Sequence, residues 1–143
     1  MVFVTAVLSG LFALFFIKLS LNVIRLRKMN QITLIEGGID ALDRAIRVRA
    51  SFSEYVPLGL VMMGTLELNG APSLLIALLG MVLLLGRYLH ARGLSHSLQS
   101  SQSRINGTKS TFLALALLAL SNIGWTAYQL LESARFASNA FVQ

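Results

Sequence analysis

The stretch RVRASFSEYVPLG, residues 47–59, decides the fold of this chain. It begins with two arginines, contains the acid Glu54, and runs directly into the apolar segment VMMGTLEL. If one helix continues through it, Arg47, Ser51, Glu54 and Tyr55 share a face, because they are spaced by four, seven and eight positions. A carboxylate in a membrane is costly unless it faces a protein interior or a watery cleft and finds a partner. The stretch therefore predicts a membrane helix with one polar, protein-facing end.

The composition of the chain favours a membrane as its solvent. Hydrophobic residues make up 55% of the 143 residues and charged residues only 13%, whereas a soluble domain has roughly 25% charged residues. This leaves too little polar material to cover a surface that faces water. The length indicates a single domain, residues 1–143.

Four apolar runs predict an all-α membrane protein, a four-transmembrane-helix bundle. We expect its helices at about residues 2–28, 40–68, 73–95 and 108–134. A spanning helix needs about 20 residues. The apolar part of the second helix, residues 52–68, is shorter than this, so its amphipathic start is expected to extend the same helix out of the bilayer.

The basic residues between the runs predict the orientation. The first connection, residues 25–49, has six of them and the third, residues 91–109, has three, whereas the turn ELNGAP, residues 67–72, has none. The first and third connections are therefore expected in the cytoplasm, with both termini on the opposite side. The net charge is +6, but because it lies between the apolar runs it favours anionic ligands and topology over nucleic acid.

Two further helices are expected to bring polar side chains to the level of Glu54. The third apolar run ends in GRYLHARG, residues 86–93, where Arg87 and His90 share a face. The first run ends in SLNVIRLRK, residues 20–28. Together these segments predict a basic pocket at the cytoplasmic interface with an acid inside it.

Simpler explanations exist for each of these residues. The basic residues that end the first helix can set the topology and reach lipid headgroups. Arg49 can be a solvated charge, Tyr55 an aromatic residue of the membrane interface, and Glu54 a partner in interhelical packing. His90 and His96 lie six positions apart and share no helix face, and the chain has no cysteine, so no metal site is predicted.

Four strings in order along nearly the whole chain, SLNVIRLRK, RAIRVRASFSEYVPLG, LELNGAP and GRYLH, resemble the MAPEG family, the membrane-associated proteins of eicosanoid and glutathione metabolism. The resemblance is to its small bacterial members, and the second-helix string is the most specific part. It implies a homotrimer in the bacterial inner membrane that binds glutathione as a cofactor between subunits, near the cytoplasmic face. A lipophilic small-molecule substrate would enter sideways from the membrane lipids.

The resemblance also implies which residues form the site. The glutathione contacts on one subunit fall on the second-helix motif and on the end of the third helix, and the neighbouring subunit adds two basic residues. These positions are Arg47, Ser51, Glu54, Tyr55 and His90, with Arg27 and Arg49 from the neighbour, and Arg104 as the nearest candidate for the arginine that activates the thiol.

Two departures from the family pattern bear on the expected function. Ser51 replaces the more usual asparagine, and Leu94 stands where several relatives have a tyrosine. The favoured function is a glutathione-dependent transferase or peroxidase for lipophilic electrophiles or lipid hydroperoxides. A non-catalytic lipid-binding or scaffold protein of the same fold is the alternative that Leu94 favours. A structural or transport protein with purely topological basic loops is the third, and the acid Glu54 argues against it.

Overall fold

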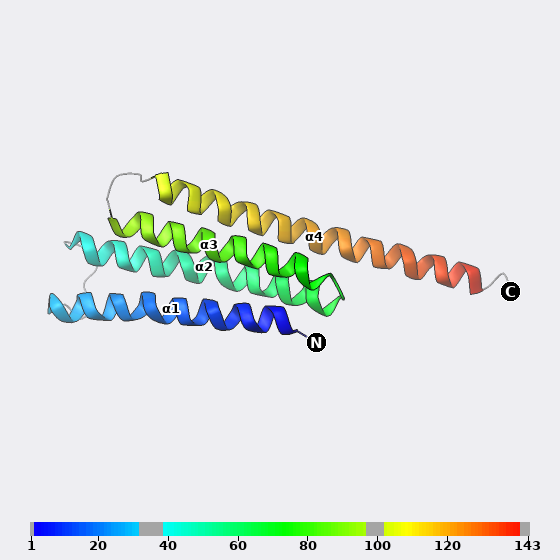
Figure 1. The fold of residues 1–143 in the computed structure, drawn as a ribbon, viewed down its shortest axis with the longest axis horizontal. Helices are drawn as coiled ribbons and strands as arrows, with labels where there is room; N and C mark the ends of the chain where they lie inside the picture. The colour runs from blue at the N-terminus through cyan, green and yellow to red at the C-terminus, as the bar shows by residue number, and fades with distance from the viewer. Residues whose placement is uncertain (1, 32–38, 97–101, 141–143) are drawn as a thin grey trace.

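A computed structural model describes residues 2–31, 39–96 and 102–140 of the chain. It contains four helices, α1 (Phe3–Met29), α2 (Asp40–Leu68), α3 (Ser73–His96) and α4 (Gln102–Ala140). They run alternately up and down, with both ends of the chain and the α2–α3 turn at one end of the bundle (Figure 1). α2 and α3 form its centre: each packs on three other helices, while α1 and α4 do not touch each other within the described residues.

Within the described ranges, α1, α3 and α4 are long and apolar enough to cross a membrane. In lipid the backbone N–H and C=O groups find no water, so a helix that satisfies them internally is the stable form for such apolar segments. α2 differs because its first half, DALDRAIRVRASFSE, is highly charged. Its apolar second half packs along its neighbours. The expected four-helix architecture is confirmed, and three of the helices have the length and hydropathy that spanning a membrane requires.

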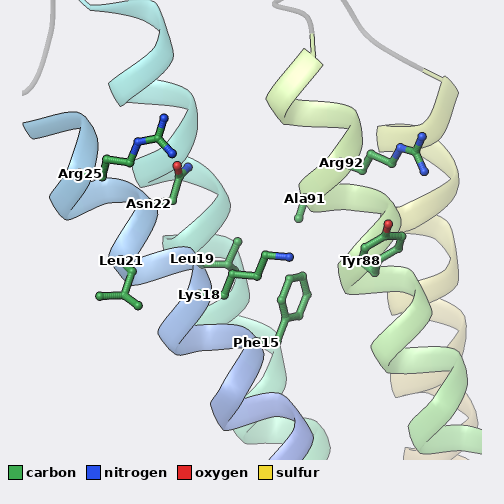
Figure 2. A pocket seen from close by; sticks show the side chains of 9 residues that line it. All are labelled: Phe15, Lys18, Leu19, Leu21, Asn22, Arg25, Tyr88, Ala91 and Arg92. Atoms are coloured by element: carbon green, nitrogen blue, oxygen red, sulfur yellow. The ribbon is translucent and has the colours of Figure 1, made fainter. Parts of the chain in front are cut away.

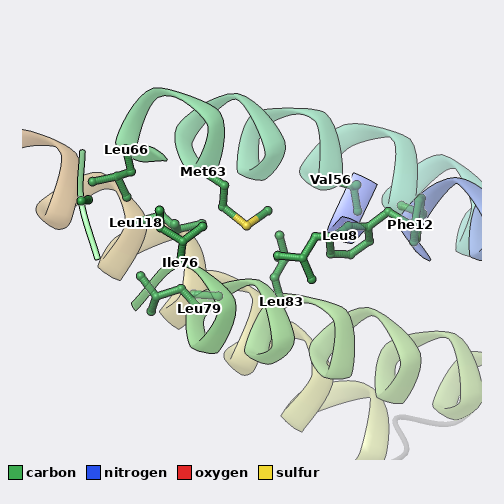
Figure 3. Packing of buried hydrophobic residues seen from close by; sticks show 12 residues of the cluster. Leu8, Phe12, Val56, Met63, Leu66, Ile76, Leu79, Leu83 and Leu118 are labelled. Atoms are coloured by element: carbon green, nitrogen blue, oxygen red, sulfur yellow. The ribbon is translucent and has the colours of Figure 1, made fainter. Parts of the chain in front are cut away.

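The core lies where α2, α3 and α4 meet. Met63 and Leu66 of α2 point toward Ile76 of α3 and Leu118 of α4 (Figure 3), and all four side chains are fully buried. On the α1 side, Phe52 contacts three phenylalanines at ring-centroid distances of 5.4–6.0 Å, namely Phe12, Phe15 and Phe16. Aromatic pairs of this kind contribute about 0.5–1.5 kcal/mol each beyond the area that they bury.

The α2–α3 turn is fixed by a glycine in the left-handed region and by hydrogen bonds. Gly70 adopts φ +77°, which only glycine reaches without strain. The N–H groups of Gly70 and Ala71 donate to the carbonyls of Glu67 and Leu66 at 3.1 and 3.0 Å, the pattern of a Schellman motif that ends a helix. The indole Nε1 of Trp125 donates to the Asn69 carbonyl at 2.8 Å, so α4 is held against the turn.

Glu67, one residue before the end of α2, fixes the start of α1. Its two carboxylate oxygens accept hydrogen bonds of 2.8 Å from the N–H groups of Val4 and Thr5. Such N–H groups at a helix start have no partner inside the helix, and the helix dipole favours a negative charge beside them. The Glu67 carboxylate of α2 therefore caps the N-terminus of α1.

α4 is longer than the apolar run at residues 108–134 indicated. It begins at Gln102 and ends at Ala140, because its polar first turns pack along α3 and continue the helix. Its 39 residues correspond to about 58 Å, well beyond the 30 Å of a hydrocarbon core. Figure 1 shows its C-terminal part projecting past the α2–α3 turn.

Candidate functional site

A buried arginine joins three helices at the polar end of the bundle. The side chain of Arg87 on α3 is only 3% exposed. Its Nε donates to Thr111 Oγ1 on α4 at 3.0 Å, and its Nη1 donates to the Ser51 hydroxyl and carbonyl on α2 at 3.0 and 3.2 Å. The rigid fork of the guanidinium allows it to hold partners in two directions. Arg87 therefore fixes Ser51, a predicted site residue, relative to α3 and α4.

Glycines bring α3 and α4 into close contact beside this arginine. A Cβ atom placed on Gly107 would lie 2.4 Å from the backbone N of His90, and one on Gly93 would lie 2.5 Å from the backbone N of Arg104. Small residues permit such close backbone approach between membrane helices. The start of α4 is therefore held directly against the end of α3, where the two predicted residues His90 and Arg104 are found.

His90 faces α4 at this contact. Its Nδ1 lies 3.1 Å from Thr108 Oγ1, and that hydroxyl in turn donates to the carbonyl of Arg104 at 3.0 Å. Arg87 precedes His90 by one turn on the same helix. A histidine, a threonine and two arginines thus occupy one level of the bundle.

Tyr55 completes the α2 side of this cluster. Its ring centroid lies 5.1 Å from the guanidinium carbon of Arg87, a cation–π distance, and its ring meets Phe112 of α4 edge-on at 5.6 Å. Glu54, the preceding residue, is exposed. We call Ser51, Tyr55, Arg87, His90 and Thr108 the α2–α3–α4 cluster.

The remaining predicted residues lie around the cluster or apart from it. Arg47 and Arg104 are exposed and Arg49 is half-buried. Arg27 is at the end of α1, a helix that does not touch α4 in the described part of one subunit, so one subunit does not bring Arg27 and Arg104 together. The side chain of Leu94 lies outside the described residues.

Sequence reasoning missed three members of the hydrogen-bond network, Arg87, Thr108 and Thr111, as site residues. Arg87 lies three positions before His90, which predicted a shared face but not burial. Its partners Ser51 and Thr111 are 36 and 24 positions away. In the sequence, Thr108 and Thr111 are marked only by their hydroxyl groups at the start of the fourth apolar run.

An apolar hollow lies on the other side of α2. A hollow of about 250 Å³ between α1 and α2 is lined almost entirely by carbon, including Phe12, Phe16 and Leu60. Ser53 and Pro57 border it on α2. Because proline has no N–H, the carbonyl of Ser53 has no partner from Pro57 in the helix, and this acceptor lies next to Glu54.

Comparison with known proteins agrees with the sequence pattern. The model of the MAPEG family matches residues 5–124. The chain is 36% identical over 132 residues to the inner membrane protein YecN of Escherichia coli strain K12, covering 92% of this chain and 99% of that protein. The YecN protein of Escherichia coli O6:H1 strain CFT073 matches to the same extent.

Proposed function

This chain belongs to the MAPEG family, and from that membership we propose that it is an integral inner-membrane protein that binds glutathione between the subunits of a homotrimer. The family generally uses glutathione. The proposed activity is that of a glutathione transferase or peroxidase acting on lipophilic electrophiles or lipid hydroperoxides. The thiolate of bound glutathione would attack an electrophilic carbon and displace a leaving group. In the peroxidase reaction it would attack a hydroperoxide oxygen, which breaks the O–O bond and releases an alcohol, and a second glutathione would convert the resulting sulfenic acid into the disulfide and water.

The observation that carries this proposal is the α2–α3–α4 cluster beside the exposed pair Arg47 and Glu54. Arg87 holds Ser51 and Tyr55 from behind, so their positions are set before any ligand arrives. Preorganisation of this kind lowers the ordering cost of binding. The charges of Arg47 and Glu54 then remain on the accessible side of the same helix.

The chemistry of these residues fits the tripeptide. Glutathione has two carboxylates, one ammonium and one thiol. Arginines bind carboxylates through paired, charge-assisted hydrogen bonds, and the side chain of Arg47 is exposed, so a ligand can reach it. The carboxylate of Glu54 suits the ammonium. Ser51 and Tyr55 supply hydroxyl groups at neighbouring turns, while the shorter serine replaces the amide that other family members have.

Activation of the thiol is assigned to Arg104. A thiol with a pKa of about 8.5 is only a few per cent ionised near neutral pH. Lowering that pKa by about 2 units takes about 2.7 kcal/mol of preferential stabilisation of the thiolate. A guanidinium in a partly dry cleft supplies interactions of this size. Arg104 is exposed, and its backbone lies directly against Gly93 at the end of α3, which supports a position at the edge of the site.

A neighbouring subunit would complete the site. Arg27 and Arg49 are the two basic residues that we assign to the neighbour, and the separation of α1 from α4 in one subunit is compatible with this. The hollow between α1 and α2 would receive the lipophilic substrate. We place the α1–α2 and α3–α4 connections in the cytoplasm, because the basic residues gather there.

A glutathione titration of the detergent-purified protein, followed by thiolate absorption in the ultraviolet, tests the proposal. Wild-type protein should give a saturable thiolate signal at neutral pH. Arg47→Ala and Glu54→Ala should abolish binding, whereas Arg104→Ala should bind but give no thiolate signal. Arg27→Ala should weaken binding, while its neighbour Lys28→Ala, which removes the same charge from the same helix end, should not.

Normal binding by both Arg47→Ala and Glu54→Ala would refute the assignment of the site. Binding without a thiolate signal in the wild type would favour the alternative, a scaffold of the same fold that keeps the ligand but performs no chemistry. The substitution of the usual tyrosine by Leu94 is the observation that favours this second function.

A further inference from the structure

A cleft between α1 and α3 lies on a different face of α3 from the α2–α3–α4 cluster. It has a volume of about 730 Å³, within the range of roughly 300–1,000 Å³ typical of small-molecule sites. Its lining includes three cationic side chains, Lys18, Arg25 and Arg92, with Asn22 and Tyr88 between them. The site proposed above takes none of its residues from this lining.

Figure 2 shows the order of these side chains along the cleft. Arg25 and Arg92 lie toward the connecting segments, Lys18 lies further in with its amine directed into the gap, and Phe15 lies below it. Leu19 and Leu21 add further apolar surface. The cleft is therefore cationic at the membrane surface and apolar toward the membrane centre, the polarity of an anionic lipid.

No residue that lines the cleft compensates its positive charge. No acidic residue lines it, and within the described ranges no hydrogen bond or ion pair joins Lys18, Arg25 or Arg92 to another side chain. Three like charges around one hollow repel one another, and at a membrane surface each basic residue gains about 1 kcal/mol from an anionic lipid. An anion bound in the cleft would offset the repulsion among these three charges.

The depth of Lys18 favours a bound ligand over topology alone as the reason for the cluster. It precedes Arg25 by seven residues, or about 10 Å along the helix. The polar zone of one leaflet is only about 5–8 Å thick. If Arg25 lies at the headgroups, Lys18 lies inside the hydrocarbon region, where a lysine is costly unless its amine finds a polar partner.

We propose that the α1–α3 cleft is a binding site for an anionic phospholipid from the leaflet next to the α1–α2 and α3–α4 connections. Arg25 and Arg92 flank the headgroup, and Lys18 reaches the phosphate from below. An acyl chain lies along Phe15 and Leu19. The site is independent of glutathione binding, because the cleft and the α2–α3–α4 cluster use different faces of α3.

Native mass spectrometry of the delipidated wild-type protein with added lipid tests the proposal. The probes are phosphatidylglycerol, which is anionic, and phosphatidylcholine, which is zwitterionic, with identical acyl chains. Wild-type protein should bind phosphatidylglycerol at least tenfold more tightly. The variant Lys18→Gln/Arg25→Gln/Arg92→Gln should lose this preference. Its affinity for phosphatidylglycerol should fall roughly fivefold for each removed charge.

The matched control is Lys28→Gln/Arg44→Gln/Lys109→Gln, which removes the same total charge outside the cleft and should keep the lipid preference. If the triple cleft variant does not fold, the single variant Lys18→Gln should lose about fivefold in affinity and Lys28→Gln should lose none. Glutathione binding should be the same in the cleft variants as in the wild type, whether or not the proposed function is correct.

Three results would overturn the proposal. Equal binding of the two lipids would show that the cleft does not select a negative headgroup. An equal loss in the control variant would mean that diffuse charge attracts the lipid. Competition by free glycerol phosphate at the same concentration as the lipid would show that the ligand is a soluble anion.

Discussion

At the scale of single residues, the buried Arg87 needs many hydrogen-bond partners, because its guanidinium has five N–H donors. It is buried, its hydrogen bonds reach hydroxyl groups on two other helices, and no carboxylate is hydrogen-bonded to it within the described residues. Removal of a partner from such a group leaves the others unsatisfied, which costs more than the bond itself contributes.

Arg87→Met should therefore lower the free energy of unfolding by about 2–3 kcal/mol, and Thr111→Val by about 1 kcal/mol. Because both remove the same bond, the double variant should be less destabilised than the sum by about 1 kcal/mol. Denaturant unfolding in detergent measures all three. Additive effects would mean that the bond between Arg87 and Thr111 contributes nothing on its own.

Glu67 gives a second prediction at this scale. Glu67→Gln keeps one acceptor oxygen but removes the charge at the start of α1, and should cost about 1 kcal/mol of stability. Hydrogen exchange at the amides of Val4 and Thr5 should accelerate. The control Glu132→Gln, an exposed position of α4, should stay within about 0.5 kcal/mol of the wild type. Unchanged exchange at Val4 and Thr5 would exclude the cap.

At the scale of elements, the contact between α3 and α4 determines the geometry of the site. It depends on glycines that face the backbone of the opposite helix. A flexible side chain can move away from an added methyl group, but a helix backbone cannot do so without shifting the helix.

Gly107→Ala should separate the two helices locally and cost about 1–3 kcal/mol, with loss of the contact between His90 and Thr108. The matched control is Gly124→Ala on the same helix, where an added Cβ meets nothing within 4 Å. That variant should gain up to about 1 kcal/mol from helix propensity. Unfolding and glutathione titration of both variants measure the difference, and equal behaviour would disprove the close approach.

At the scale of the whole molecule, the helices could be predicted from sequence, whereas the network between them could not. Apolar runs are continuous in sequence, so α1 to α4 follow from composition and length. The bonds of Arg87 join positions 24 and 36 residues apart, and burial at such distances depends on helix rotation. The motif around Glu54 predicted a polar face on α2, and the pairing of this face with Arg87 became visible only in the folded bundle.

The orientation of the molecule is also testable, because the chain has no cysteine and each introduced thiol is unique. Asn30→Cys, at the connecting end of α1, and Asn69→Cys, in the α2–α3 turn, lie at opposite ends of the bundle. A membrane-impermeant maleimide applied to spheroplasts should label only Asn69→Cys. Permeabilised cells should label both. The reverse pattern would invert the proposed topology.

The cap that Glu67 provides for α1 has a consequence for biosynthesis. The acceptor follows the Thr5 amide by 62 residues, so it leaves the ribosome roughly 3–12 s later at ordinary elongation rates. We therefore expect α1 to enter the bilayer before a partner for its first turn is available. The position of that turn should be fixed only when the end of α2 arrives, so that the α1–α2 hairpin matures before α3 and α4 join it.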